Sequence, residues 1–285
     1  MTQSRRTLFA LDLDGTLLDS RGKLAAADRA AVAAAVGLGS AVVICTGRGA
    51  HTARPILDLL PAGCYAGLHN GALLQRPNGG VMRRAYLESN ALAVMTEVLI
   101  SEQLEPLAYV ERAPCAPTSS VRLVVRESAL GTAVLEAYLA SKKPILEPVQ
   151  EVARHAGEWA LGLVTFGEPA RVQRAVRALA HVAPSARCWG APFRGTDALV
   201  LEAVPANGTK GAALRAVAEA LGLAPRDTVA VGDNLNDLDM LQAAGVAVAM
   251  GNAVEEAKRM AAWTTVDNDS AGVAAVIARV LEINS

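Results

Sequence analysis

The chain has 285 residues, of which 52% are hydrophobic, and its 27 basic side chains nearly balance its 28 acidic ones. A net charge of −1 gives no electrostatic reason to expect nucleic acid or an anionic membrane as partner. No apolar stretch approaches the ~20 residues of a membrane helix. The four scattered cysteines lack redox or metal-ligand spacing. We therefore expect a cytoplasmic protein with reduced thiols, a monomer or a small homo-oligomer.

Strand and helix patterns alternate through the first third of the chain. Strands are expected at 7–13 and 41–45, and helices at 24–37 and 49–60. The two strands are short and almost wholly apolar, with helical segments between them. This rhythm is typical of a parallel sheet that helices cover on both faces.

The middle of the chain has a different pattern. We expect strands at 121–125 and 159–166, helices at 89–104, 129–140 and 169–181, and a hairpin over 186–204. Turn-forming residues cluster at Pro77–Gly80 and at Pro205–Gly208, on either side of this region. We therefore interpret 84–203 as an inserted α/β domain and assign 1–83 and 204–285 to one core.

The last third returns to the alternating pattern. Helices are expected at 209–221, 235–244, 253–261 and 270–282, with strands at 228–232, 246–250 and 263–266. The predicted fold is therefore an α/β protein with a doubly wound, Rossmann-like parallel sheet. The inserted α/β segment forms a second domain.

Acidic residues stand at the ends of two predicted strands that lie far apart in the sequence. Asp12 and Asp14 end the first strand, and Gly232–Asp237 follows the strand at 228–232. Alternation along a strand predicts that Asp12 and Asp14 face the same side. In a parallel sheet the carboxyl ends of the strands form one rim, where ligands bind. Neighbouring carboxylates repel, so the pattern indicates a divalent metal site.

The same rim carries the residues that phosphoryl chemistry needs. An aspartate can attack phosphorus and form an acyl phosphate, while a second acid transfers protons. The hydroxyl of Thr46 and the backbone N–H groups that follow it, in Thr46-Gly47-Arg48, would cradle phosphate oxygens at a helix start. Lys210 would neutralise charge on the phosphoryl group and on Asp12. Oxygen-rich acids suit Mg²⁺.

Taken in order, these elements resemble the four motifs of the haloacid dehalogenase-like superfamily of phosphotransferases. Asp12–Thr16 is similar to the first motif, Thr46 to the second, Lys210 to the third and Gly232–Asp237 to the fourth. The insert between the second and third motifs resembles the α/β cap of the Cof-type sugar phosphatases. Two short signatures of that branch are also present, Asn70-Gly71-Ala72 and Met250-Gly251-Asn252-Ala253.

The resemblance implies a role for each matching residue. Asp12 would be the nucleophile, and Asp14 the general acid and base that also offers a backbone carbonyl to Mg²⁺. Thr46, with Gly47, and Lys210 would hold the phosphoryl oxygens. Asp12, Asp14 and Asp233 would therefore form the metal site.

Further residues of the motifs would support this site. Asp237 would bind the metal through water or orient Lys210, while Asn236 and Arg48 would support the site. Asn252 would approach the phosphate; the alternative is an N-cap of the helix at 253–261.

Two residues of the predicted hairpin are candidates for substrate contacts. Trp189 and Arg194, with Phe193 between them, would line a pocket for the substrate. The alternative is an ordinary hairpin in which the aromatic side chains pack against the domain.

These patterns predict an Mg²⁺-dependent phosphatase that hydrolyses a small phosphorylated metabolite, a sugar phosphate, through an aspartyl phosphate. A phosphosugar mutase or another phosphotransferase of the same superfamily is the alternative. Two other classes remain: a signalling receiver module, which also combines acids with a Thr and a Lys, and a binding protein without activity. The sequence does not identify the substrate, because fold does not determine it.

Overall fold

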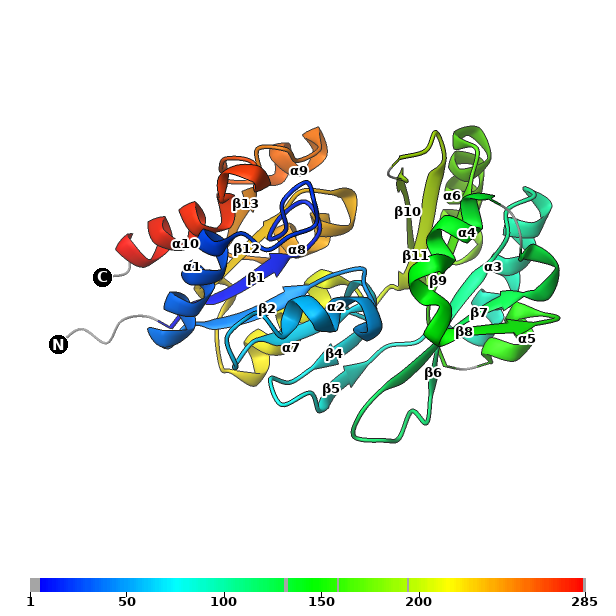
Figure 1. Cartoon of the computed structure of the whole chain (residues 1–285), viewed down its shortest axis with the longest axis horizontal. Coiled ribbons are helices and arrows are strands. Elements are labelled where there is room, and N and C mark those ends of the chain that lie inside the picture. The colour runs from blue at the N-terminus through cyan, green and yellow to red at the C-terminus, as the bar shows by residue number, and fades with distance from the viewer. Residues whose placement is uncertain (1–5, 131–132, 158, 194, 284–285) are drawn as a thin grey trace. The chain divides into compact units, whose positions relative to one another are not determined.

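The computed structural model describes residues 6–130, 133–157, 159–193 and 195–283. These residues form two compact units (Figure 1). The first comprises the chain up to Arg48, Thr52–Met82 and the residues from Thr209 onward, and the second comprises Gly49–His51 and Arg83–Gly208. The second unit is thus inserted into the first between β5 and α7.

The first unit contains an eight-stranded sheet with the order β14-β13-β12-β1-β2-β3-β4-β5. The strands are β1 (Leu8–Asp12), β2 (Ala41–Cys45), β3 (Tyr65–Leu68), β4 (Leu73–Gln75), β5 (Val81–Arg84), β12 (Thr228–Gly232), β13 (Val246–Ala249) and β14 (Trp263–Thr264). The six strands from β14 to β3 run parallel, whereas β4 lies antiparallel to β3. The predicted parallel α/β core is confirmed.

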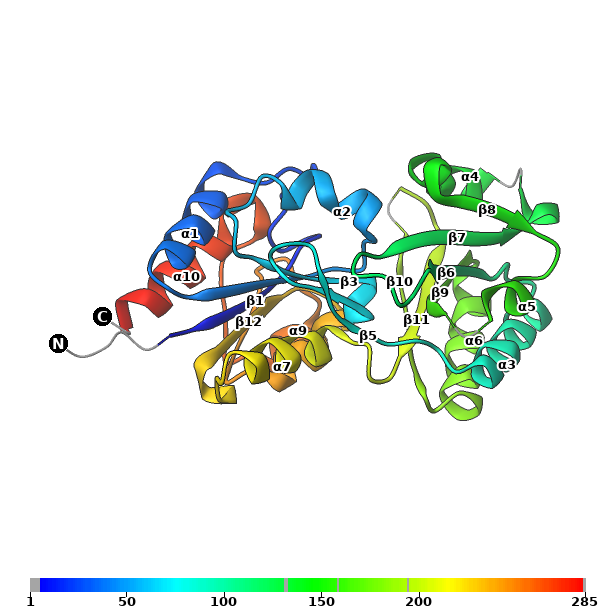
Figure 2. The ribbon, with the colours of Figure 1, turned by 90° about the horizontal axis from the view of Figure 1, so that it is seen from below.

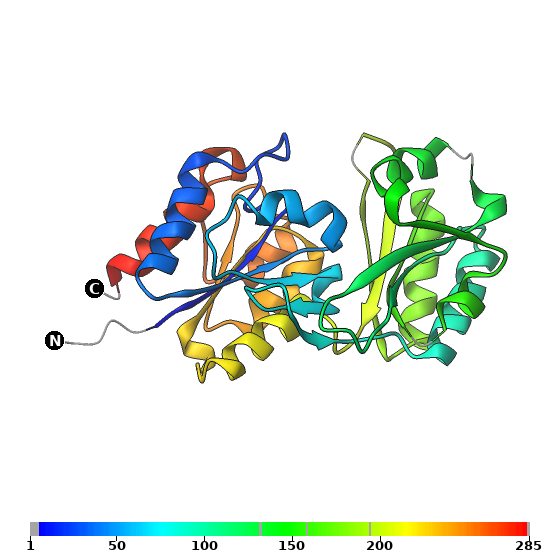
Figure 3. The same ribbon diagram turned by 60° about the horizontal axis from the view of Figure 1, so that its bottom comes forward.

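Helices cover both faces of this sheet, which explains why β1, β2 and β12 are buried throughout. In Figure 2, α1 (Ala26–Gly37) and α10 (Gly272–Ile283) lie above the sheet, and α7 (Lys210–Ala220) and α9 (Glu255–Met260) lie below it. Figure 3 shows α1 and α10 side by side. The remaining helices of this unit are α2 (Ala50–Leu57) and the short α8 (Leu238–Ala243).

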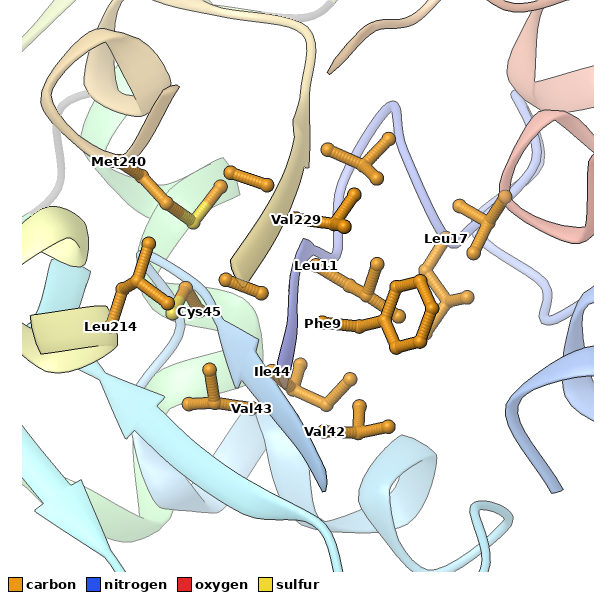
Figure 4. Close-up of a cluster of buried hydrophobic side chains, with 14 of the residues drawn as sticks. Phe9, Leu11, Leu17, Val42, Val43, Ile44, Cys45, Leu214, Val229 and Met240 are labelled. Carbon is orange, nitrogen blue, oxygen red and sulfur yellow. The ribbon is translucent and has the colours of Figure 1, made fainter. Parts of the chain in front are cut away.

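The register of β1 on β2 determines which face Asp12 occupies. Phe9 and Leu11 pair with Val42 and Ile44, and all four side chains lie on one side of the sheet in Figure 4. Asp12 pairs with Cys45 and therefore has the opposite parity. In the same figure Cys45 lies toward Leu214 of α7 and Met240 of α8. The carboxylate of Asp12 therefore belongs to the face covered by α7.

The second unit has its own six-stranded sheet, with the order β10-β11-β9-β6-β7-β8. Its strands are β6 (Leu107–Arg112), β7 (Ser120–Arg126), β8 (Leu146–Val149), β9 (Ala160–Gly167), β10 (Ala186–Pro192) and β11 (Leu199–Pro205). All neighbours are antiparallel except β7 and β8. The predicted hairpin over 186–204 corresponds to β10 and β11.

The helices of the second unit are α3 (Ser89–Ser101), α4 (Ala133–Leu139), α5 (Val152–Ala156) and α6 (Pro169–Val182). In Figure 2, α3 and α6 lie below the sheet and α4 lies above it. Apolar residues of α3 and α6 form a separate core with the sheet, including Leu92, Leu99, Val172 and Leu179. Each unit thus buries its own hydrophobic cluster.

The expected elements mostly match, but one helix is shorter than expected and several short elements were missed. The helix expected at 129–140 is shorter, because 3₁₀ turns at Glu127–Ala129 and Ala140–Ile145 flank α4. Strands β3, β4, β5, β6 and β8 and the short helix α5 were not predicted. Among the described residues, no helix has the length and apolarity that a membrane crossing requires.

Candidate active site

The main candidate residues lie at the carboxyl ends of three parallel strands, at one edge of the first sheet. Asp12 is the last residue of β1, Thr46 directly follows β2, and Asp233 directly follows β12. Because β1 pairs in parallel with both β2 and β12, these ends lie at the same rim. The predicted convergence of distant sequence segments is therefore present in the fold.

A buried lysine joins two of the acids at this rim. The Nζ atom of Lys210 lies 2.5 Å from Oδ1 of Asp12 and 2.6 Å from Oδ1 of Asp237. The lysine side chain is 1% exposed, and those of Asp12 and Asp237 are 5% and 0% exposed. Thr209 caps α7 by accepting the N–H of Ala212 at 3.2 Å, which fixes Lys210 at the first helical position.

Asp237 is held from both sides. While Oδ1 contacts Lys210, Oδ2 accepts the backbone N–H groups of Asp233 and Asn234, each at 2.9 Å. Gly232 permits this arrangement, because a Cβ there would lie 2.6 Å from Asp237 Cβ. Asp237 thus connects Lys210 with the backbone of the loop after β12.

Asp233 lies against the turn that follows β1. Its Oδ1 accepts the hydroxyl of Thr16 at 3.0 Å, a contact that the sequence analysis did not predict. Gly15 has φ +88°, and a Cβ on it would lie 2.4 Å from Asp233 Oδ2. Only glycine therefore allows the turn and the carboxylate to approach this closely.

The charges of this cluster do not balance. Ligand oxygens of Asp12, Asp233 and Asp237 all lie within 4.8 Å of one another, with one lysine among them. Burial, reinforced by the charge of Asp237, raises the pKa of Asp233 to about 6 and also raises the pKa of Asp12. Burial opposes the ammonium charge of Lys210, but Asp12 and Asp237 outweigh it and raise the pKa of the lysine.

Asp14 lies beyond the end of β1, and its side chain is partly exposed. Strand β1 ends at Asp12, so the alternation of a strand no longer applies two residues later. The carboxylate of Asp14 instead accepts Nε of Arg48 at 2.7 Å and Nη2 at 2.5 Å. The alternation on which the shared direction of the two carboxylates was predicted therefore does not extend to Asp14, which is outside the three-acid cluster.

The loop after β2 is built around Thr46. Its Oγ1 accepts the N–H of Arg48 at 3.1 Å, and its carbonyl accepts the N–H of Asn70 at 2.8 Å. Asn70 has φ +57° and its Oδ1 accepts Nδ2 of Asn236 at 2.9 Å. A Cβ at Gly47 would lie 3.3 Å from this amide oxygen. Asn70, noted only as part of a signature, thus connects the second and fourth motifs.

Asn252 is not a helix cap, because α9 begins after Val254. Its Nδ2 donates to the carbonyl of Gly15 at 2.8 Å, and its Oδ1 accepts the N–H of Asn268 at 3.0 Å. Asn268 in turn donates to the carbonyl of Leu18 at 2.7 Å. Asn252 therefore holds the turn after β1 in place.

The two hairpin candidates belong to the second unit. Trp189 lies on β10 opposite Glu202 of β11 and is partly buried. Arg194 lies outside the described residues. Phe193 packs against Phe166 with ring centroids 4.8 Å apart, and Phe166 also packs against Tyr138, which favours a packing role for Phe193.

The donor set of the rim fits a hard divalent cation. Asp12 and Asp233 present carboxylate oxygens in a cluster where three carboxylates face one ammonium. Mg²⁺ binds through one or two carboxylates and retains several waters. A divalent cation would also offset the burial that raises the pKa values of both acids.

Comparison with known proteins agrees with this geometry. The family model described as haloacid dehalogenase-like hydrolase matches residues 9–277, so the chain belongs to that family. A Bacillus subtilis relative, 5-amino-6-(5-phospho-D-ribitylamino)uracil phosphatase YwtE, is 28% identical over 96% of this chain and 97% of its own length. The receiver-module hypothesis is therefore wrong.

Solved structures show the same fold. A haloacid dehalogenase-like hydrolase from Bacteroides thetaiotaomicron has TM-score 0.75 at 25% identity, covering 96% of this chain and 99% of its own. A subclass IIB sugar phosphatase of the superfamily has TM-score 0.76 at 18% identity, covering 96% and 98%. The protein is thus a phosphatase of the haloacid dehalogenase superfamily, and its fold is that of subclass IIB.

Proposed function

We propose that the protein is an Mg²⁺-dependent phosphatase that hydrolyses a small phosphorylated metabolite, a sugar or sugar-alcohol phosphate, through a phosphorylated Asp12. One observation carries this proposal: buried Lys210 contacts Asp12 at the end of β1, beside Asp233 and Asp237. A lysine that only stabilised the fold would not need three carboxylates around its single positive charge.

The proposed reaction has two displacements. An oxygen of Asp12 forms a bond to phosphorus as the bond to the leaving oxygen breaks, and Asp14 gives its proton to that oxygen. Water then attacks the phosphorus, Asp14 takes the proton of the water, and Asp12 is released with inorganic phosphate. The separate positions of the two carboxylates support a division between nucleophile and proton carrier.

The phosphoryl oxygens would be held by Thr46, Gly47 and Lys210, with Asn252 near them. Thr46 follows β2 at the same rim as Asp12, and its hydroxyl oxygen accepts a backbone N–H, which leaves its proton available for a phosphate. Lys210 keeps its charge beside two carboxylates. Both groups would neutralise the negative charge that develops in the transition state.

The metal would be held by the side chains of Asp12 and Asp233 and by the main-chain carbonyl of Asp14. When bound, Mg²⁺ would supply positive charge to the phosphoryl oxygens and to the nucleophile. The excess of carboxylates around Lys210 supports this assignment. Asp237 would orient Lys210, and Asn236 would hold the side chain of Asn70.

We further propose that the inserted segment, 84–203 in the sequence interpretation, acts as a cap that selects the substrate. It lies between Thr46 and Lys210 in the sequence, two residues that would hold the same phosphate. The YwtE relative is named for a phosphorylated ribityl compound, which supports a polyol phosphate as substrate class. A phosphosugar mutase is not favoured, because this relative is named as a phosphatase.

The test is a screen of sugar, sugar-alcohol and cofactor phosphates that measures kcat/KM by release of inorganic phosphate, with and without chelator. The proposal predicts Mg²⁺-dependent release that is strongest for one polyol phosphate. Isomerised sugar phosphate formed in excess over phosphate would instead establish the mutase. The variant Asp12→Asn provides the blank.

A further inference from the structure

The carboxylate of Asp14 forms a bidentate ion pair with the guanidinium group of Arg48. Two guanidinium nitrogens, Nε and Nη2, bind the two oxygens of Asp14 at 2.7 and 2.5 Å. Such a bidentate pair fixes the plane and direction of a carboxylate, which a single hydrogen bond does not. The side chains of Arg48 and Asp14 are 27% and 45% exposed, so Asp14 is held in place while solvent still reaches it.

Arg48 is itself fixed at two further points. Its backbone N–H donates to Thr46 Oγ1 at 3.1 Å, and its Nη1 donates to the carbonyl of Thr52 at 3.3 Å. The side chain of Arg48 therefore connects the loop of the proposed phosphate cradle with Asp14, the proposed proton carrier. A movement of that loop would move Asp14 with it.

The turn after β1 leaves Asp14 without the support that Asp12 has. Asp12 is buried and held by Lys210, whereas Asp14 lies beyond the strand end and is the exposed residue of a turn that is otherwise buried. Gly15, with φ +88°, follows at once, and Asn252 holds its carbonyl, so the backbone of the turn is fixed while the side chain of Asp14 points out of it toward solvent. Arg48 thus supplies, from the loop after β2, the orientation of the Asp14 carboxylate that the backbone of the turn does not give.

We infer that Arg48 is a positioning residue that aims the carboxyl group of Asp14 at the leaving oxygen of the substrate. The inference rests on the proposed function, in which Asp14 is the general acid. It assigns Arg48 a place in proton transfer, rather than a general supporting role or a contact with phosphate. It applies to the step in which the bond from phosphorus to the leaving oxygen breaks.

This role has a signature in the leaving group. An alkyl phosphate needs a proton on its leaving oxygen, whereas a nitrophenyl phosphate releases a stable phenolate and does not. The value of kcat/KM reports the steps up to departure of the leaving group. Misplacement of Asp14 should therefore reduce kcat/KM for the alkyl substrate alone, by about 100-fold, the effect of a catalytic group displaced by about 1 Å.

The experiment compares Arg48→Ala, Arg48→Lys and Asp14→Asn with the parent on both substrates. Arg48→Ala should lose about 100-fold on the best alkyl phosphate of the screen and less than about threefold on nitrophenyl phosphate. Arg48→Lys keeps the positive charge but not the two parallel N–H donors, so its loss on the alkyl phosphate should be smaller than that of Arg48→Ala but still measurable. Arg54→Ala is the matched control, because Arg54 of α2 forms an exposed ion pair with Asp58, the residue directly after the helix, and its loss should change neither rate.

A double variant shows whether Arg48 acts through Asp14. Asp14→Asn with Arg48→Ala should be no slower on the alkyl phosphate than Asp14→Asn alone, since the group to be positioned is already gone. Multiplied losses, equal losses on both substrates, or full rescue by Arg48→Lys would overturn the inference and identify Arg48 as a phosphate contact.

The proposed function can fail separately. If Asp14→Asn itself shows no preference for the aryl substrate, Asp14 is not the general acid, and the proposed mechanism fails together with the inference. If Asp14→Asn shows that preference and Arg48→Ala does not, the mechanism stands and only the role of Arg48 is wrong. Thermal unfolding of every variant confirms that the proteins compared are folded.

Discussion

A lysine at the first position of a helix is normally disfavoured, because the helix dipole places partial positive charge there. Lys210 occupies that position in α7 and is nevertheless almost completely buried. The carboxylates of Asp12 and Asp237 compensate for both costs, and Asp233 adds a further negative charge nearby. The balance of charge in this cluster therefore determines what single substitutions do.

Replacing Asp12 by Asn should abolish turnover and leave the fold intact. The amide is a poor nucleophile, but its oxygen can still accept a hydrogen bond from Lys210. We expect kcat to fall more than about 10³-fold, as for removal of other nucleophiles. Phosphate release and near-UV circular dichroism measure the two effects, and Asp58→Asn, on the exposed surface, is the control. A folded Asp12→Asn variant with kcat within tenfold of the parent would exclude Asp12 as nucleophile.

Replacing Lys210 by Met should destabilise the protein by about 3–5 kcal/mol, because two buried carboxylates lose their partner. The loss should be larger at pH 8 than at pH 5, since burial raises the pKa of Asp12 and its protonation at low pH removes one unpaired charge. Urea unfolding measures it. The control Lys258→Met removes a partly exposed lysine paired with Glu255 and should change stability by less than about 0.5 kcal/mol. Similar losses for both variants would contradict the buried ion pair.

The raised pKa of Asp233 predicts how stability depends on pH. Its folded-state value of about 6 exceeds the unfolded value of roughly 3.9. Between those values the folded state keeps a proton that the unfolded state has lost, so stability of the metal-free protein should fall as pH rises from about 4 to 6. Since Mg²⁺ requires the carboxylate, its stabilising effect at a fixed low concentration should grow over the same range.

Thermal unfolding with and without Mg²⁺ at pH 5, 6, 7 and 8 tests this linkage. The shift in Tm caused by Mg²⁺ should increase up to about pH 6–7 and then level off. The variant Asp233→Asn should lose the shift at every pH. A shift in the parent that is the same at pH 5 and pH 7 would show that Asp233 does not couple proton and metal binding.

At the scale of elements, the turn after β1 is the critical connection. Gly15 and Gly22 both have positive φ, +88° and +74°. A Cβ on Gly15 would lie 2.4 Å from Asp233 Oδ2, whereas a Cβ on Gly22 would have nothing within 4 Å. Substitutions at these two glycines therefore distinguish the effect of backbone strain from the effect of displacing Asp233.

Gly22→Ala should cost about 1–2 kcal/mol of stability through backbone strain and leave kcat unchanged. Gly15→Ala should carry the same strain, and in addition displace Asp233 and lower kcat by about 100-fold. Urea unfolding and phosphate release at saturating Mg²⁺ distinguish the two effects. Equal kcat values for the two variants would mean that the turn does not position Asp233.

The elements that the sequence predicted best are those with a uniform environment. Strands β1, β2 and β12 are apolar because helices cover both faces of the sheet, and that burial is visible in the composition. Strand β6 was missed because it contains Glu111, whose burial depends on Arg84 and Tyr86 from a distant segment. Contacts of that kind have no local pattern.

In the candidate site, too, the features that follow from local patterns could be predicted, and the contacts between distant segments could not. The rim could be predicted, since parallel strands place their carboxyl ends together. The direction of Asp14 could not, because it depends on Arg48 rather than on the strand. The contacts of Thr16 with Asp233 and of Asn236 with Asn70 were also missed, as each joins segments more than 160 residues apart in sequence.

For the whole molecule, the inserted segment should determine which phosphates are accepted. Trp189→Ala should change kcat/KM unequally across a panel of sugar phosphates, because specificity is a difference in transition-state binding. Trp263→Ala in the first unit, where Arg279 stacks on the ring, is the control and should leave the order of preference unchanged. If Trp189→Ala also preserves that order, then Trp189 makes no selective contact, and specificity depends on other residues.

The central claim is that Asp12 becomes phosphorylated during turnover. The most direct measurement is rapid quenching during hydrolysis of a good substrate with Mg²⁺, then borohydride reduction and peptide mass spectrometry. Reduction converts an aspartyl phosphate to homoserine, so the account predicts homoserine at position 12, and none in Asp12→Asn or in excess chelator. Normal phosphate release with Asp12 unmodified, or with the modification on another residue, would contradict it.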